Sequence, residues 1–162
     1  MKRLLILFCL SPFCSAQSKP HTSLTVGSVS LWLGMPKAEA LQALEDAGIT
    51  KQSDAGGLYI IVGSGEMGTM SFTNGRLSFA DREWISQDKT YVDAMLGALE
   101  ALSSHGAVNC RIQHAPITEP NQRANRIFID CGDRGVMLMQ GSFQATGNIT
   151  SVTERIGHLT AK

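Results

Sequence analysis

Polar and apolar side chains alternate on both sides of Asn74-Gly75, across the segment Met70–Phe79. An Asn-Gly pair between two alternating runs favours a two-residue type I′ hairpin turn, because both residues tolerate the positive φ that this turn needs. The turn predicts four cross-strand pairs: Thr73 with Arg76, Phe72 with Leu77, Ser71 with Ser78, and Met70 with Phe79. Each pair joins residues of like polarity, so we expect one apolar and one polar face.

Two further strands and a helix are predicted in the first half of the chain. Alternation over 24–33 and the apolar run Leu58–Val62 are typical of strands. Between them, Pro36 suits the first turn of a helix and Gly48 suits its C-terminal end. Residues 51–57 predict a turn-rich link between the helix and the second strand.

Helical spacing returns at Thr90. Thr90 and Asp93 stand at capping-box spacing, and Gly106 suits the end of the helix. The apolar face expected for this helix consists of Val92, Met95, Leu96, Leu99 and Leu102. The rest of the chain predicts strands over 107–114, 125–131, 134–140 and 149–157, with a loop over 116–125.

The predicted pairing of two later strands also places two cysteines opposite each other. If 107–114 and 125–131 form a hairpin in which Ala115 opposes Arg126, Cys110 lies directly opposite Cys131. Such a pair can form a disulfide when its Cβ atoms fall within ~4.5 Å. We therefore predict a disulfide between Cys110 and Cys131.

The first sixteen residues have the features of a secretory signal peptide. Lys2 and Arg3 precede the apolar run Leu4–Leu10, and Ala16 is a small residue at the expected cleavage site. The apolar run is too short to span ~30 Å of hydrocarbon, so we expect no transmembrane segment in the mature chain. The residues before Cys14 do not match a lipoprotein signal, so we expect no lipid anchor. These features predict a periplasmic or secreted protein of a bacterium.

Cleavage near Ala16 changes the composition of the chain. The mature chain keeps only Cys110 and Cys131, in an oxidising compartment where a disulfide is the usual state. It also keeps 12 of the 14 basic residues and all 14 acidic ones, which gives a net charge of −2. Phosphate binding needs clustered Lys and Arg, which the sequence lacks. We therefore expect no binding to nucleic acid.

Motifs that suggest chemistry each have a structural explanation. The segment Gly63–Gly68 matches the spacing of a dinucleotide-binding loop, but it leads into a predicted strand and not into a helix. Cys110, His114 and Cys131 lack the close cysteine pair and fourth ligand of a structural zinc site. A Cys–His nucleophile would require one cysteine to stay reduced. We therefore predict no catalytic residue, no metal site and no cofactor.

The order of predicted elements indicates an α+β fold. We expect an antiparallel sheet, two packing helices and one disulfide. A signal peptide (1–16) and a flexible segment (17–23) would precede a single domain over 24–162. A helix followed by hairpins occurs twice, which suggests a loose duplication with sub-repeats 24–86 and 88–158.

Two motifs in the first half resemble a known family. The segment Leu33–Leu41 is similar to the Gly-Met-Ser/Thr-x-x-Glu/Gln-Val helix opening of the β-lactamase inhibitory protein family and of small SmpA/OmlA-type envelope lipoproteins. The family's Phe-Thr-Asp-Gly-x-Leu hairpin, which runs on to a basic residue and a Trp, resembles Phe72–Leu77 followed by Arg82 and Trp84. The likeness covers about residues 30–84, and Pro36 departs from it by replacing the capping Ser or Thr. It implies a fold whose sheet binds other proteins and catalyses nothing.

Aromatic and arginine side chains supply the candidate binding surface. If Phe79 faces the helices, alternation sends Arg82 and Trp84 to the other face. Aromatic and arginine residues are typical of protein-binding hot spots. The predicted binding residues are Trp32, Tyr59, Arg76, Arg82 and Trp84. The alternative is that the second half of the chain covers this surface.

These observations favour a non-catalytic, extracytoplasmic module that binds an unknown protein partner. The alternative is a small secreted or periplasmic enzyme, or a ligand-binding protein, with a cleft between the two halves. A continuous exposed aromatic face would support the first prediction. A deep pocket that brings His114 close to carboxylates would support the second.

Overall fold

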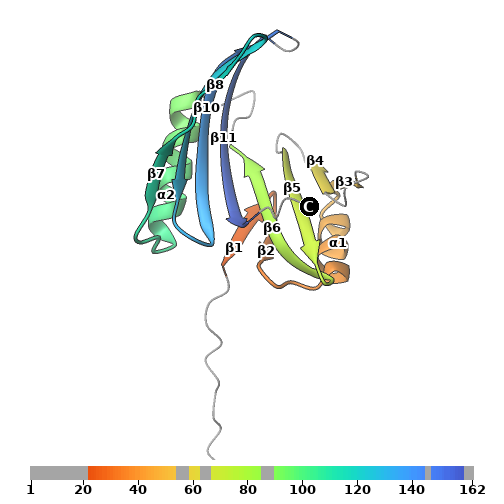
Figure 1. Ribbon diagram of the computed structural model, residues 1–162. Coiled ribbons are helices and arrows are strands. Elements are labelled where there is room, and N and C mark those ends of the chain that lie inside the picture. Colours follow the sequence, from red (N-terminus) through yellow and green to blue (C-terminus); the bar gives the residue numbers. More distant parts are fainter. Residues whose placement is uncertain (1–21, 54–58, 63–66, 85–89, 145–146, 159–162) are drawn as a thin grey trace, which may run out of the picture.

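A computed structural model describes residues 22–53, 59–62, 67–84, 90–144 and 147–158 (Figure 1). The elements of the first half are β1 (Ser23–Val26), β2 (Val29–Trp32), α1 (Lys37–Asp46), β3 (Thr50–Ser53), β4 (Tyr59–Val62), β5 (Met67–Thr73) and β6 (Arg76–Glu83). Those of the second half are α2 (Tyr91–Ser104), β7 (Arg111–His114), β8 (Ile117–Glu119), β9 (Gln122–Asp130), β10 (Arg134–Phe143) and β11 (Gly147–Gly157). The predicted signal peptide and residues 17–21 lie outside the described residues.

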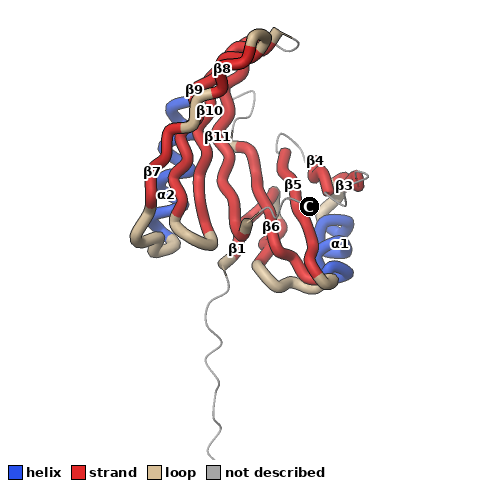
Figure 2. The backbone as a smooth tube through the Cα atoms, viewed as in Figure 1, coloured by secondary structure: helices blue, strands red, loops and turns tan. Residues whose placement is uncertain are grey.

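Antiparallel sheet dominates the described part of the chain (Figure 2). Nine strands form one sheet in the order β3-β4-β5-β6-β11-β10-β9-β7, with β8 paired to β9. The last strands of the two halves, β6 and β11, pair at its centre, while β1 and β2 form a separate hairpin. With the two helices of the described residues, the protein has the predicted α+β class. The longer helix of the described part has 14 residues, and neither helix qualifies as a membrane span.

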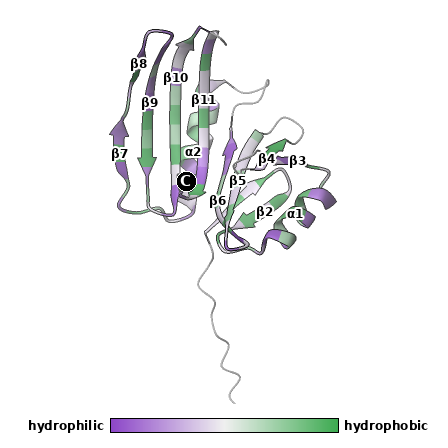
Figure 3. Cartoon of the chain, turned by 45° about the vertical axis from the view of Figure 1, so that its right-hand side comes forward, coloured by the Kyte–Doolittle hydropathy of each residue, from purple (hydrophilic) through white to green (hydrophobic). Residues whose placement is uncertain are grey.

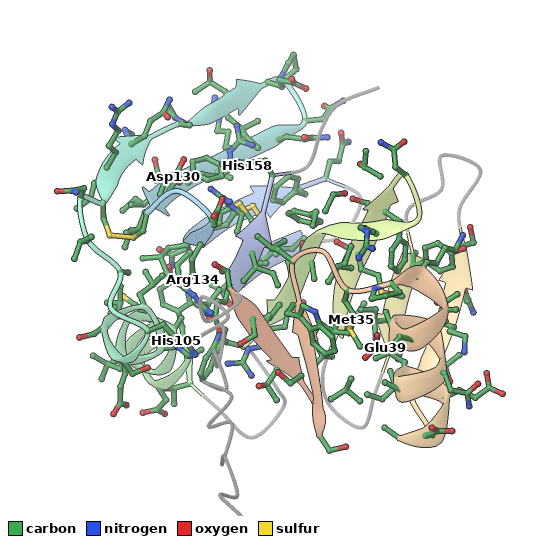
Figure 4. All side chains as sticks on the ribbon, turned by 90° about the horizontal axis from the view of Figure 1, so that it is seen from below. Met35, Glu39, His105, Asp130, Arg134 and His158 are labelled. Carbon is green, nitrogen blue, oxygen red and sulfur yellow. A yellow bond between two sulfur atoms is a disulfide. The ribbon has the colours of Figure 1, made fainter. Side chains whose placement is uncertain are left out.

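Both helices cover the same face of the sheet. Val152 and Ile156 point from β11 to one side, because an even number of positions separates them. Val152 belongs to a core cluster beneath α2, and Ile156 to a second cluster beneath α1 and the β1–β2 hairpin. Figure 4 shows both helices on this side, with Arg134 among them and Asp130 on the opposite side. We call the opposite side, which no described helix covers, the helix-free face.

The central hairpin forms with a one-residue irregularity. Asn74 and Gly75 have φ values of 53° and 72°, as the predicted turn requires. Thr73 pairs with Arg76 and Phe72 with Leu77, but a bulge then pairs Ser71 with Phe79 and Met70 with Ala80. The predicted pairs of Ser71 with Ser78 and Met70 with Phe79 are therefore wrong.

The bulge lies where β6 changes its hydrogen-bonding partner. Leu77 donates to Met35 O at 2.8 Å and accepts from Gly34 N at 2.8 Å. Beyond the bulge, Ala80 pairs with Ile156 of β11 instead. An extra residue on one strand reverses the side-chain phase that follows it. Phe79 therefore leaves the predicted apolar face and lies on the helix-free face.

The second half follows its predicted register more closely. Arg111 pairs with Asp130 and His114 with Ile127, as the expected pairing requires, and a disulfide joins Cys110 to Cys131. The predicted loop over 116–125 is wrong, because Ile117 pairs with Ala124 in the same register and extends the hairpin as β8 and β9. Pro116 fits there because an edge strand tolerates a residue without an N–H group.

Three other predicted boundaries change. The strand predicted over 24–33 is two strands, β1 and β2, with a turn at Gly27. Residues 51–53 of the predicted link belong to strand β3, which begins at Thr50, and residues 54–57 lie outside the described residues. Ser23, assigned to the flexible segment, begins β1.

Helix α2 forms with its capping box and buries part of the predicted face: Leu102 is buried, and Met95 and Leu99 pack against the core cluster beneath α2. The Thr90 side chain accepts from the Asp93 N–H, and the Asp93 side chain accepts from the Thr90 N–H. Val92 and Leu96 are 54 % and 56 % exposed, although they were expected in the core. The buried positions are Ala94, Ala98 and Leu102. Small residues allow a close approach here, since a Cβ at Gly97 would lie 2.6 Å from the Trp84 ring.

Candidate functional site

A hollow of about 560 Å³ lies on the helix-free face. Its lining comes from β6 of the first half and from β7, β9, β10 and β11 of the second. The apolar side chains of Phe79, Phe128 and Met137 contribute to it, as do several charged ones. β9 and β10 carry green stretches in Figure 3, because Ile127–Ile129 and Val136–Met139 are apolar runs. We call this site the central hollow.

Four charged side chains stand in one row across the hollow. Asp81 of β6 opposes Arg155 of β11, and Arg155 opposes Gly135 of β10. Gly135 in turn opposes Asp130 of β9, which opposes Arg111 of β7. All four charged residues line the hollow. The row crosses strands from both halves, so no local sequence pattern reveals it.

The middle of the row is an ion pair between strands that are not neighbours. Arg155 Nη2 lies 3.0 Å from Asp130 Oδ1, although β10 runs between their strands. A Cβ at Gly135 would lie 3.1 Å from Arg155 Nε. The missing side chain therefore gives the Arg155 guanidinium room to cross β10. Asp130 Oδ1 also accepts from the Gly132 N–H at 3.0 Å.

Asp81 is the partly buried end of the row. Its Oδ1 accepts a hydrogen bond of 2.6 Å from the Thr69 N–H. Burial raises the pKa of the Asp81 carboxyl above its ordinary value of 3.8; the Thr69 hydrogen bonds lower it and the Glu83 charge raises it. Within the described residues, Asp81 has no ion-pair partner. The carboxyl group is therefore easier to protonate than an ordinary aspartate.

The other titratable candidate lies elsewhere. Arg111 and Gln113 of β7 line the hollow, so His114, the next residue, points to the opposite face. His114 Nε2 lies 3.3 Å from Asn125 Oδ1, and neither residue lines the hollow. The hollow therefore does not bring His114 together with carboxylates. In the described part of the chain, no cluster of three metal-ligating side chains occurs.

The predicted aromatic surface is divided between the two core clusters. Trp32 and Tyr59 pack against the cluster beneath α1, where the Tyr59 and Phe72 rings meet edge to face at 5.5 Å. Trp84 packs against the cluster beneath α2. Arg76 is exposed, and its Nη1 donates to Gly34 O at 2.9 Å. These side chains do not form one continuous surface.

The bulge explains part of this outcome. Alternation correctly predicts that Arg82 and Trp84 face away from Phe79. Because the bulge turns Phe79 to the helix-free face, Arg82 and Trp84 lie on the helix side. The prediction that Arg82 and Trp84 lie on the face opposite Phe79 was right. The prediction that Phe79 faces the helices was wrong.

Arg82 and Trp84 instead surround a buried carboxylate. Glu154 is 1 % exposed, and its Oε2 accepts from Arg82 Nε at 3.0 Å and from Trp84 Nε1 at 3.2 Å. Arg134 Nη1 donates to the other oxygen at 2.5 Å. The two arginines also donate to backbone carbonyls of β1, at Thr25 and Ser23. This group attaches β1 to the sheet.

Glu154 and Arg134 were not among the residues predicted from the sequence. Glu154 stands in phase with Val152 and Ile156, both of which are buried. A charged residue in the apolar phase of a strand is the signal that could have identified it.

Comparison of the chain with protein-family models, with curated proteins and with solved structures finds no match. The resemblance of residues 30–84 to the β-lactamase inhibitory protein family stays a prediction. A function is therefore proposed from the geometry of the helix-free face.

Proposed function

We propose that the chain is a non-catalytic, extracytoplasmic protein-binding module. Its partner would lie against the helix-free face, with an anchor residue in the central hollow. One observation carries this proposal: the hollow combines apolar and charged side chains on the sheet face that both helices leave open. The extracytoplasmic location rests on the signal-peptide features of residues 1–16.

The composition of the hollow suits a protein anchor. Binding energy in protein interfaces concentrates where a few side chains fill well-packed pockets. Aromatic residues, Met and Arg are enriched in such interfaces. Phe79, Phe128, Met137, Arg111 and Arg155 supply all three types around one hollow.

Exposed apolar residues extend this surface toward the β3 edge of the sheet. Ile61 of β4 is buried in the core beneath α1, so its neighbours Ile60 and Val62 point to the helix-free face. They are 36 % and 41 % exposed, and Met67, which opposes Val62, is 54 % exposed. Exposed apolar surface of this kind marks interaction sites. The proposal thus moves the binding surface from Trp32, Tyr59 and Trp84 to the opposite face.

The proposal also includes a loose structural duplication. Each half supplies a helix followed by antiparallel strands, and the final strands β6 and β11 pair at the centre of the sheet. The central hollow is lined from both halves. Joining the repeats 24–86 and 88–158 would therefore create the binding site.

Site-specific cross-linking tests the proposed face. The mature chain carries a photo-reactive phenylalanine at Gln113 in the hollow or, as a matched control, at Glu100 on the exposed side of α2. We expect a protein adduct from the native envelope or medium only with the Gln113 probe. The captured protein is then purified and its Kd for the unlabelled chain is measured.

A Phe128→Ala variant completes this test. We expect its Kd for the purified partner to rise about tenfold or more, because truncating a hot-spot aromatic residue costs roughly 2 kcal/mol or more. Glu100→Ala should leave the Kd unchanged, and the unfolding midpoint of each variant is checked first. Equal adducts from both probe positions, or an unchanged Kd for Phe128→Ala, would contradict the proposal.

A small-molecule site is the second candidate function. A volume of about 560 Å³ lies within the range of ligand pockets, roughly 300–1,000 Å³. Native mass spectrometry of the purified mature chain distinguishes the two functions. A bound mass that is lost on denaturation and absent from Phe128→Ala would favour the small molecule.

A further inference from the structure

We infer that the central hollow receives a carboxylate, presented by the partner as an acidic side chain that pairs with Arg111. This inference rests on the proposed function and specifies the chemistry of the anchor residue. The supporting observation concerns the row from Asp81 to Arg111: among the described residues, the two inner charges form an ion pair and the two outer charges do not.

The two inner members of the row satisfy each other, and the two outer members do not. Arg155 and Asp130 form an ion pair of 3.0 Å. Arg155 also donates to Gly157 O. By contrast, the Arg111 side chain has neither an ion-pair nor a hydrogen-bond partner in the part of the chain that the structure describes. Arg111 lines the hollow, and the carboxylate opposite it, Asp130, is paired with Arg155.

When a partner covers the hollow, the consequences for the Asp81 carboxyl and the Arg111 guanidinium differ. Asp81 can lose its charge by taking up a proton when it is removed from water. The Arg111 guanidinium keeps its charge at any physiological pH. Covering a charge that can be neither neutralised nor paired is unfavourable. An anion from the partner removes this penalty, whereas a second cation would increase it.

The neighbours of Arg111 suit a carboxylate on an apolar stem. Gln113 lies on the same face of β7, and its amide offers two further donors. Phe128, which opposes Gln113, and Met137, which opposes Phe128, provide apolar contacts for the stem. Asp130 is the nearest repulsive group, but its Oδ1 is already held by Arg155 and by the Gly132 N–H. An incoming carboxylate therefore approaches Arg111 from the Gln113 side.

The base of Arg111 is held in place by covalent structure. Cys110, the preceding residue, is joined to Cys131, which follows Asp130. Arg111 itself pairs with Asp130 in the β7–β9 ladder. A cation whose backbone is held at the rim of an apolar hollow can discriminate between a carboxylate and its neutral isostere.

Three short peptides test the inference without the partner. The probes are acetyl-Leu-Glu-Phe-amide and the same peptide with Gln or Lys in place of Glu. Their Kd values are measured by NMR titration of the mature chain, and the side-chain N–H signals of Arg111 and Gln113 are followed. We expect the Glu peptide to bind about tenfold more tightly than the Gln peptide, since hydrogen bonds to charged groups are the stronger ones. The Glu peptide should also shift both signals.

Two arginine variants make the test specific. Arg111→Gln should abolish the preference for Glu over Gln. Arg123→Gln is the matched control and should keep it, because Arg123 is also exposed and without a described partner but lies outside the hollow. The inference is overturned if the Glu peptide does not bind, if the Lys peptide binds best through Asp81 and Glu83, or if Arg111→Gln keeps the preference.

The outcomes also separate this inference from the proposed function. If Phe128→Ala weakens binding of the cross-linked partner and Arg111→Gln does not, the protein-binding face stands and the carboxylate anchor is rejected. If the peptides show an Arg111-dependent preference and no protein cross-links to Gln113, the carboxylate site stands and protein binding is rejected.

Discussion

Asp81 shows how the sheet changes the chemistry of a single side chain. Its carboxyl group accepts one backbone hydrogen bond and is partly removed from water, without a cation paired to it in the described residues. Burial raises its pKa above the ordinary value of 3.8. The folded chain therefore holds this proton more tightly than the unfolded chain does. Stability contributed by this group is present below pH 3.8 and is lost as the pH rises through the raised pKa.

An Asp81→Asn variant isolates this contribution. The amide oxygen can still accept the Thr69 N–H, but the side chain no longer ionises. We expect a higher unfolding midpoint than wild type at pH 7 and a difference that disappears below about pH 3.8. Thermal unfolding by circular dichroism between pH 3 and pH 8 measures it, with the exposed Asp133→Asn as control. A variant that is less stable than wild type at pH 7 would show that Arg155 stabilises the Asp81 carboxylate.

At the scale of elements, buried charges attach the β1–β2 hairpin to the sheet. Glu154 accepts from Arg82, Arg134 and Trp84, and both arginines donate to carbonyls of β1. Among the described residues, no hydrogen-bonded ladder joins β1 to the nine-stranded sheet. Side-chain hydrogen bonds therefore replace a strand pairing at this junction, together with the packing of Leu24 and Val26 in the core.

Glu154→Gln should weaken this attachment strongly. Removing one member of a buried ionic group leaves uncompensated charge, so we expect a loss of about 3–5 kcal/mol in the free energy of unfolding. Urea denaturation measures the loss, and hydrogen exchange should show early opening of the β1 amides. Glu83→Gln is the matched control, because Glu83 is partly exposed and points to the other face of β6. A Glu154→Gln loss no larger than that of Glu83→Gln would disprove this role.

At the scale of the whole molecule, the disulfide secures the β7 edge of the sheet. Residues of β7 are exposed throughout, and the one strand that pairs with β7 in the described part of the chain is β9. The link between Cys110 and Cys131 spans 21 positions, and an edge strand with one neighbour depends on such a constraint. Loss of the link would also release Arg111 at the rim of the hollow.

A Cys110→Ser, Cys131→Ser variant tests this constraint. The chain-entropy relation predicts a loss on the order of 3 kcal/mol in the free energy of unfolding. Urea denaturation with and without a thiol reductant measures it: wild type should lose stability on reduction, and the serine variant should not respond. If the reductant leaves wild type unchanged, the disulfide does not stabilise the fold.

Features that depend on neighbouring residues were predictable. The Asn74-Gly75 turn, the Thr90–Asp93 capping box and the alignment of Cys110 with Cys131 all follow from spacings of a few residues to about twenty. Local backbone geometry and side-chain alternation determine such features, so the sequence determined by itself the Asn74-Gly75 turn, the start of the second helix and the disulfide.

Only the tertiary structure decided which face each element presents. The bulge in β6 depends on Met35 and Ile156, which pair with the same strand from distant parts of the chain. The buried face of α2 depends on the Trp84 ring beside Gly97. The row from Asp81 to Arg111 needs five paired strands and the missing side chain of Gly135. Segments far apart in the sequence bury one another, and a one-residue shift turns the side chains of a strand to the opposite face. The open face and its hollow therefore appear only when the strands are assembled.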